Sequence, residues 1–187
     1  MYQIDDMRAV LKNKLSEKRY EHTLGVEYTA AALAMCYSAD IEKARIAGLL
    51  HDCAKYFPGD KLLSKCKKYD LPVNKYEKNF PELLHAKVGA YLASSKYGVK
   101  DEEILSAITW HTTGRPEMTL LDKIIYIADY MEPNRDKAPN LSTIRQLAFQ
   151  NIDLCLTTIL DHTLTYLKEN GSVIDPTTFA TYEYYRR

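Results

Sequence analysis

The sequence predicts an all-α protein, and three observations support this prediction. Apolar residues recur at spacings of three and four along nearly the whole chain, which is the period of a helix with one buried face. No segment shows the sustained alternation of apolar and polar residues that a half-buried strand requires. The chain has 187 residues, of which 46% are hydrophobic and only seven are glycine. This length and composition suit one compact domain with a sizeable core.

Helix-start and helix-stop signals organise the first half of the chain. A first helix is expected at about 5–16 and a second at about 18–37. Asp40 is positioned to cap a third helix, whose apolar end leads directly into the pair His51-Asp52. Proline and glycine turns then bound a short, lysine-rich surface helix at about 61–68.

Four further helices are expected in the second half of the chain, at about residues 81–97, 101–111, 120–131 and 141–169. Pro81 suits the first turn of a helix, and Thr119 is positioned to cap the helix that follows it. The tail after Gly171 is expected to begin as an extended segment. Since no linker is long enough to divide the chain, residues 1–187 are predicted to form a single domain, with a core at about 18–135 followed by the C-terminal helix and the tail.

Charge and cysteine content exclude several classes of protein. The 25 basic and 25 acidic side chains give a formal net charge of zero, whereas proteins that bind duplex nucleic acid usually carry a basic excess. The four cysteines form no CxxC pair, so neither a zinc ribbon nor a disulfide framework is indicated. With no signal peptide and no membrane-spanning stretch in view, a reducing cytoplasm is the expected location. A formal net charge of zero is still compatible with a small anionic ligand that local cations bind.

Polar residues interrupt the predicted apolar stripes at a few positions. His22, His85 and His111 each share a helix face with apolar neighbours, so each is expected to point inward. Asp122 and Asp129 are seven residues apart and lie on nearly one face of an otherwise apolar helix. Each of these residues taken alone is commonly a core residue with a hydrogen-bond partner. A buried carboxylate nevertheless needs a cation, a metal or a histidine beside it.

The convergence of these residues predicts a metal site. Four of the five histidines and two or three carboxylates fall on inward stripes of five separate helices, and His51-Asp52 closes one of these helices. A divalent metal is the simplest common partner, because imidazole and carboxylate are ligands of borderline and hard transition metals. Iron or manganese fits this thiolate-free set better than a structural zinc. The fifth histidine, His162, is interpreted as a core residue.

The same positions resemble the motif of a known family. His22, His51-Asp52 and Asp129 resemble the H…HD…D signature of the HD-domain metal-dependent phosphohydrolases. His85 and His111 lie between the HD pair and the last aspartate, and resemble the extended set of six ligands in some HD proteins that hold two metals. Three longer runs are similar to the YqeK family, the bacterial symmetrical diadenosine tetraphosphate hydrolases, at residues 48–55 (GLLHDCAK), 110–114 (WHTTG) and 121–135 (LDKIIYIADYMEPNR).

The resemblance covers nearly the whole chain and implies a fold, an activity and a cofactor. The fold would be a single HD-domain helical bundle. The activity would be that of a symmetrical bis(5'-nucleosyl)-tetraphosphatase, a phosphoanhydride hydrolase that splits diadenosine tetraphosphate into two ADP with a metal-activated water. His22, His51, Asp52 and Asp129 would be the metal ligands. Iron is the first candidate for the metal, with manganese or cobalt as alternatives, and one or two ions would bind.

The resemblance also implies roles for residues around the metal. Asp52 and Lys55 would be catalytic. His85 and His111 would either complete a second metal site or donate hydrogen bonds to the phosphate chain. The residues implied in substrate binding are Lys55, Asp122, Lys123, Arg135, Gly171, Ile174 and Asp175. For Arg115 a solvated surface position is an equally good interpretation.

Two segments depart from the family pattern, and several alternatives stay open. The loop 136–140 and the tail after residue 178 lack the usual family sequences, so the roles of both segments are left unassigned. An HD-type nucleotidase or cyclic-nucleotide phosphodiesterase is the nearest alternative enzyme, and a mixed-valent di-iron oxygenase shares the set of six ligands. A non-catalytic nucleotide-sensing module is the alternative without chemistry. The partner is expected to be a small dinucleoside polyphosphate or nucleotide, and a homodimer is left open.

Overall fold

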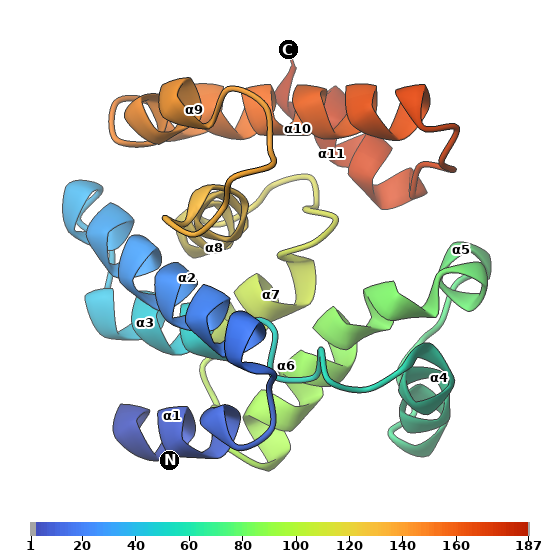
Figure 1. Cartoon of the computed structure of the whole chain (residues 1–187). Helices are drawn as coiled ribbons and strands as arrows, with labels where there is room; N and C mark the ends of the chain where they lie inside the picture. The colour runs from blue at the N-terminus through green and yellow to red at the C-terminus, as the bar shows by residue number, and fades with distance from the viewer. Residues whose placement is uncertain (1–2, 187) are drawn as a thin grey trace.

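The computed structural model describes residues 3–186, and within this range the chain is helical and contains no strand (Figure 1). The first half contains α1 (Ile4–Lys12), α2 (Glu17–Cys36), α3 (Ile41–Leu50), α4 (Gly59–Lys68), α5 (Lys75–Asn79) and the short 3-10 helix η1 (Pro81–Leu84). The second half contains α6 (His85–Ser95), α7 (Glu102–Trp110), α8 (Leu120–Met131), α9 (Leu141–Ala148), α10 (Ile152–Glu169) and α11 (Pro176–Tyr185). The prediction of an all-α fold is therefore confirmed.

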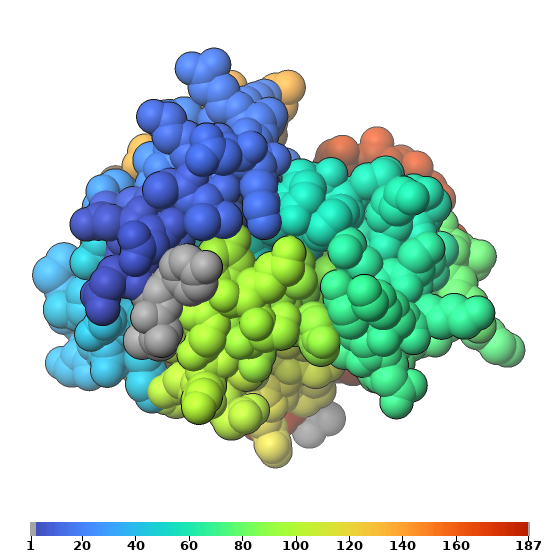
Figure 2. Space-filling model, turned by 90° about the horizontal axis from the view of Figure 1, so that it is seen from below, coloured from blue at the N-terminus to red at the C-terminus, as the bar shows by residue number. Residues whose placement is uncertain are grey.

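The helices are arranged around α8, which is seen nearly end-on in the middle of Figure 1. On one side α8 packs against α2, α3 and α7, and on the other side it packs against α9 and α10. Helix α1 lies at the end of the molecule farthest from α10, while α4 and α5 lie at the side beyond α6. Figure 2 shows the face below, where the α6 region lies between the N-terminal helices and α4. None of the helices within residues 3–186 is long and apolar enough to cross a membrane.

Side-chain caps explain why most of these helices begin where they do. The side chains of Asp40 and Thr119 accept hydrogen bonds from the backbone amides of Lys43 and Asp122, so both predicted caps are confirmed. A cap satisfies an amide that has no partner inside the helix. Further caps of this kind are Ser16, Asn74, Asp101, Asn151 and Asp175.

One predicted helix needs correction, and two short helices are not predicted. The helix expected at 141–169 is wrong as one element, because the chain breaks at Phe149–Asn151 into α9 and α10. Asn151 adopts extended backbone angles there and caps α10 through the amide of Leu154. Helix α5 is not predicted, since its five residues are too short to show a period. The tail begins without helical structure at residues 172–175, and Asp175 then caps a final helix, not predicted, that packs against α10.

Candidate metal centre

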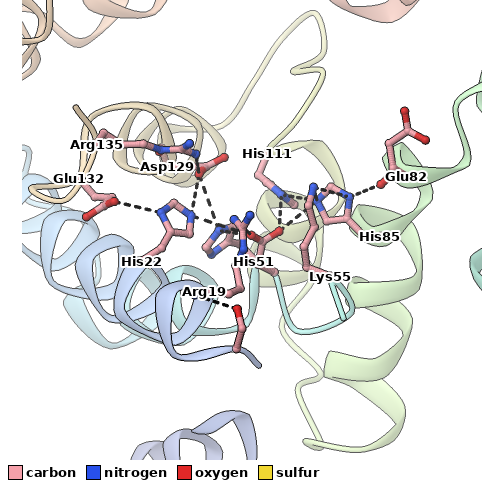
Figure 3. Close-up of polar contacts among 12 residues, drawn as sticks. Arg19, His22, His51, Lys55, Glu82, His85, His111, Asp129, Glu132 and Arg135 are labelled. Atoms are coloured by element: carbon pink, nitrogen blue, oxygen red, sulfur yellow. Dashed lines mark hydrogen bonds and ion pairs between the residues drawn. The ribbon is translucent and has the colours of Figure 1, made fainter. Parts of the chain in front are cut away.

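Four histidines and two aspartates converge beside α8 (Figure 3). His22 projects from α2 and Asp129 from α8, whereas the other four residues lie at helix ends. His51 directly follows α3 and precedes Asp52, His85 begins α6, and His111 directly follows α7. The structure thus brings together all six residues that the sequence singled out as one set.

The six side chains offer two overlapping groups of metal-ligating atoms. The first group is His22, His51 and Asp129, and the second is His51, Asp52 and His111. Within each group the ligand atoms lie within 4.8 Å of one another. His85 is in neither group, but its Nε2 atom lies 3.1 Å from Asp52 Oδ1 and 3.1 Å from His111 Nε2. The two groups share His51, whose single Nε2 lone pair binds one ion. A second, adjacent ion could be held through Asp52, because its Oδ2 atom lies 3.9 Å from His22 Nε2 and its Oδ1 atom lies 3.1 Å from His85 Nε2.

Burial shapes the electrostatics of this cluster. His51, Asp52, His85 and His111 are each at most 3% exposed. Burial disfavours ionisation of Asp52, but the neighbouring His51 and contacts with His111 and His85 lower its pKa well below the usual value. Burial is also the main cause that lowers the pKa of His85 to about 4. At neutral pH the cluster therefore contains an ionised Asp52 carboxylate beside a neutral His85 imidazole, which are the forms of these groups that bind metals.

The orientation of the rings fits a bound cation. The Nδ1 atoms of His51 and His111 lie 2.7 Å from the carbonyl oxygens of Gly48 and Ile108, so both rings donate Nδ1–H to the backbone. Their Nε2 lone pairs then point into the cluster, where the Nε2 atom of His51 has no hydrogen-bond partner among the described residues. Metal-ligating histidines usually donate their second ring nitrogen in this way. The donor set, four imidazoles and two carboxylates without a thiolate, fits a divalent metal.

A cavity of about 490 Å³ opens beside the cluster. His22, His111 and Asp129 contribute to its wall, and Tyr126 and Tyr130 add aromatic surface. Its cationic lining residues are Lys18, Arg19, Arg135 and Lys137. Asp129, Glu132 and Asp136 also line it, so a polyanion in this cavity would meet cations interspersed with carboxylates.

Two predicted substrate residues lie against the cluster. The Nζ atom of Lys55 lies 3.3 Å from both ring nitrogens of His85, and burial lowers the pKa of this ammonium. Arg135 extends from the turn after α8, and its Nη2 atom lies 2.8 Å from Asp129 Oδ1. Both cations therefore lie where they could contact a phosphate bound at the cluster.

Other predicted substrate residues have partners elsewhere. Asp122 belongs to the capping box of α8 with Thr119, and its Oδ2 atom lies 2.9 Å from Nη2 of Arg115. Lys123 is paired with Asp153, with 2.6 Å between Nζ and Oδ1. The residues Gly171, Ile174 and Asp175 lie at the end of α10 and the start of α11, away from the residues that line the 490 Å³ cavity. Their contacts with a substrate stay predictions.

Two residues at the cluster are not predicted from the sequence. Arg19 Nη1 lies 2.7 Å from Asp52 Oδ2, and Glu132 Oε1 lies 3.1 Å from His22 Nδ1. Helical spacing contains a weak signal for both, because Arg19 precedes His22 by three residues and Glu132 follows Asp129 by three. Charged side chains at such spacing are common on solvated faces, so spacing alone does not single them out.

Comparisons with known proteins agree with this geometry. The HD domain family matches residues 19–134. The chain is 42% identical to "Bis(5'-nucleosyl)-tetraphosphatase, symmetrical" of Bacillus subtilis, with 96% of both chains covered. It is 38% identical to the protein of the same name in Staphylococcus aureus, with 97% of this chain and 94% of the relative covered.

A solved structure shows the same fold. It is the crystal structure of a predicted HD superfamily hydrolase involved in NAD metabolism from Clostridium acetobutylicum, which superposes with a TM-score of 0.96 at 41% identity. The similarity covers 100% of this chain and 98% of that one. The matched range of the HD domain contains all six clustered residues. The chain therefore belongs to the HD-domain family and, within it, to the symmetrical bis(5'-nucleosyl)-tetraphosphatases.

Proposed function

We propose that this chain hydrolyses diadenosine tetraphosphate symmetrically into two molecules of ADP. The observation that carries the proposal is a buried cluster of histidines and aspartates next to a cavity whose lining includes four cationic side chains. Such a combination suits a metal-dependent phosphoanhydride hydrolase, since the reaction needs an activated water and compensation of phosphoryl charge. Relatives that match over 91 to 96% of their own length are named for this activity.

His22, His51, Asp52 and Asp129 are proposed as metal ligands. A divalent metal bound there supplies a coordinated water of lowered pKa and a Lewis acid for the phosphoryl oxygens. Iron is the first candidate, with manganese or cobalt as alternatives, because the donors are nitrogen and oxygen atoms. The nearby thiol of Cys53 does not add a thiolate ligand, since burial raises its pKa to about 12 and its Sγ atom donates to the carbonyl of Gly89.

The chain's own cations position the phosphates in this proposal. Lys55 is held inside the site as a point charge beside Asp52, where it can contact a phosphoryl oxygen at the cleaved bond. Arg19 and Arg135 each bind a carboxylate of the cluster and are about a third or more exposed, so each can also bind phosphates in the cavity. These contacts hold the reacting phosphate in one orientation.

The ring orientations favour a second ion over hydrogen bonds from His85 and His111 to phosphate. The Nδ1 atoms of both rings face backbone carbonyls, of Glu82 and Ile108, so their Nε2 atoms are acceptors in the neutral rings. Acceptors cannot donate to a phosphate, and two of them 3.1 Å apart need a positive partner. Metal analysis of protein purified without chelators is expected to give two equivalents. If only one equivalent of metal were found, the ammonium of Lys55 would be the positive partner of these two rings.

A substrate panel tests the proposed activity. Protein loaded with iron, manganese or cobalt is incubated with diadenosine tetraphosphate, mononucleotides and cyclic nucleotides, and the products are separated by chromatography. ADP is expected as the product from the dinucleotide, and His51→Ala is expected to abolish its formation because His51 belongs to both ligand groups. Faster cleavage of mononucleotides or cyclic nucleotides would support the alternative HD enzymes. Thermal stabilisation by nucleotide without turnover would support a sensing module.

We also propose a cytoplasmic location and leave the homodimer as a prediction. All four cysteines are free in the structure, which suits a reducing compartment. Light scattering of the purified protein measures the oligomeric state.

A further inference from the structure

Three of the four clustered histidines are oriented by the end of the helix to which they belong. His51 and His111 directly follow α3 and α7, and each ring faces the carbonyl of the residue three positions earlier. His85 follows η1 and is oriented in the same way by the carbonyl of Glu82. The last carbonyls of a helix accept no amide from the next turn. The carbonyls of Gly48 and Ile108 lie in such last turns, and the carbonyl of Glu82, which also accepts the backbone amide of His85, has a second lone pair. All three can therefore accept Nδ1–H from a histidine.

His22 has no such acceptor, because it lies inside α2. Carbonyl oxygens in a helix interior already accept amides from four residues later. The Nδ1 atom of His22 instead faces a carboxylate from a distant part of the chain, 3.1 Å from Oε1 of Glu132. Figure 3 shows this contact on the side of the ring opposite Asp129. The carboxylate thus takes the place that a backbone carbonyl has at the other three rings.

Glu132 is held rigidly in this position. Glu132 is only 1% exposed. Its second oxygen, Oε2, accepts a hydrogen bond of 2.7 Å from the backbone amide of Asn134. Both carboxylate oxygens therefore accept a hydrogen bond, and the charge is fixed against the His22 ring.

Gly25 provides the space for this carboxylate. It lies in α2 one turn after His22, and a Cβ atom at this position would stand 2.2 Å from Oε2 and 3.0 Å from Cδ of Glu132. Glycine inside a helix is unfavourable relative to alanine. Gly25 has no positive φ that would call for glycine. The close approach of Glu132 is therefore the structural reason for a glycine here.

We propose that Glu132 is a positioning residue for the metal centre and that Gly25 is the notch that admits it. The carboxylate accepts Nδ1–H of His22, which fixes the tautomer and leaves the Nε2 lone pair facing Asp129 Oδ1, 3.1 Å away, so that one cation would be the shared partner of both acceptors. This inference rests on the proposed function for the presence of a metal, but not for the identity of the substrate.

Metal affinity tests the role of the carboxylate. Apo protein is titrated with manganese or cobalt by calorimetry, and the cobalt absorption spectrum is recorded as a second readout. Glu132→Gln keeps the side-chain volume. The amide has one oxygen and one NH2 group, so it cannot accept hydrogen bonds at both of the positions that Oε1 and Oε2 of Glu132 occupy. We expect about a ten- to hundredfold loss of affinity, as is typical when such a partner of a ligating histidine is removed. Unchanged affinity together with an unchanged cobalt spectrum would overturn the proposal.

A matched control separates positioning from general destabilisation. Glu77 is also a buried glutamate, 6% exposed, and it caps α5 and pairs with Lys87 away from the cluster. Glu77→Gln is expected to lower stability without changing metal affinity. An equal loss of affinity in both variants would assign the effect of Glu132→Gln to folding and contradict the proposal.

A double-variant cycle tests the notch without any metal. In the protein with Glu132, Gly25→Ala is expected to lower the melting temperature, because the new methyl group would overlap the carboxylate. In the Glu132→Ala background the same change is expected to raise the melting temperature, since only the helix preference for alanine remains. A loss of equal size in both backgrounds would refute the notch. Failure to hydrolyse diadenosine tetraphosphate would refute the proposed function, but the melting temperatures of these variants would still test the notch.

Discussion

At the scale of single residues, the cluster keeps two buried carboxyl groups ionised. Burial works against ionisation of Asp52 and Asp129, yet the neighbouring histidines lower the pKa of both carboxyls. Arg19 and Arg135 add a cation to each carboxylate at the edge of the cavity. The two carboxylates proposed as metal ligands are therefore ionised and oriented before any ligand arrives, which reduces the reorganisation needed on binding.

Lys55 offers a direct test at this scale. Lys55→Met keeps most of the aliphatic side chain but removes the ammonium beside His85. We expect kcat to fall about a hundredfold, the loss typical of removing one donor to a transition-state charge. Metal content is expected to stay unchanged, as measured by elemental analysis. Lys87→Met is the control, because it removes a lysine paired with Glu77 away from the cluster. Equal losses in kcat would argue against a local role for Lys55.

The sequence anticipates the six clustered residues but not their partners. Histidines and aspartates that interrupt apolar helix faces stand out, because burying them without a partner is costly. Arg19 and Glu132 do not stand out, since charged residues are ordinary on helix surfaces and in turns. The contact of Arg19 depends on how α2 packs against the end of α3, and that of Glu132 on how α2 meets the end of α8. No local pattern encodes either contact. The partner of Lys123 depends in the same way on the packing of α8 against α10, whereas Asp122 is paired locally with Thr119 and Arg115.

At the scale of elements, the close packing of α2 on α3 positions the cluster. A Cβ atom on Gly48 would lie 3.0 Å from Cα of Glu27 and 3.1 Å from the carbonyl oxygen of Val26. The two helices therefore approach through a residue without a side chain. The carbonyl of Gly48 also orients His51, so this contact couples helix packing to the metal ligands.

Substitution of this glycine tests the coupling. Gly48→Ala is expected to destabilise the fold by about 1–3 kcal/mol, because the added methyl group must push backbone atoms apart. Gly89→Ala is the control, because its Cβ would meet its nearest neighbours at an ordinary 3.5 Å. It is expected to be neutral or stabilising by up to about 1 kcal/mol. Urea unfolding measures both free energies. Equal stability of the two variants would contradict the packing argument.

The break between α9 and α10 shows what periodicity misses. Apolar residues continue at helical spacing through 141–169, so the pattern predicts one helix. The side chain of Asn151 favours a new helix start, because it accepts from the amide of Leu154. Caps such as Asp40 and Thr119 are easier to predict, since a clear change of pattern accompanies them.

Asn151 can be tested by removing its cap. Asn151→Ala is expected to lower the free energy of unfolding by about 1 kcal/mol, the usual cost of losing an N-cap. Alanine would favour a continuous helix if one formed at 141–169. A gain in stability, measured by urea unfolding, would therefore contradict the break.

At the scale of the whole molecule, α8 links the two sides of the structure. It packs against α2, α3 and α7 on one side and against α9 and α10 on the other. Its residues Ile124, Ile125 and Ile127 are fully buried. We propose on this basis that residues 1–187 form one domain that unfolds in a single cooperative transition, which calorimetry measures.

Thiol reactivity reports the integrity of this core. Cys53 and Cys155 are buried, and burial raises the pKa of each thiol to about 12. Cys66 is fully buried as well, whereas Cys36 is exposed. At about pH 8 a thiol reagent is expected to modify Cys36 quickly and the other three only after unfolding, because reaction requires an accessible thiolate. Cys36→Ser should remove the fast phase. Rapid reaction of more thiols in the native protein would contradict the packing described.

We propose above that water at the metal centre cleaves diadenosine tetraphosphate symmetrically. Hydrolysis in water enriched with a heavy oxygen isotope, followed by mass spectrometry of the products, tests this reaction directly. We expect ADP alone, with one labelled oxygen for every two ADP molecules, and no products from the His51→Ala variant. Formation of ATP and AMP, or of ADP without label, would contradict it.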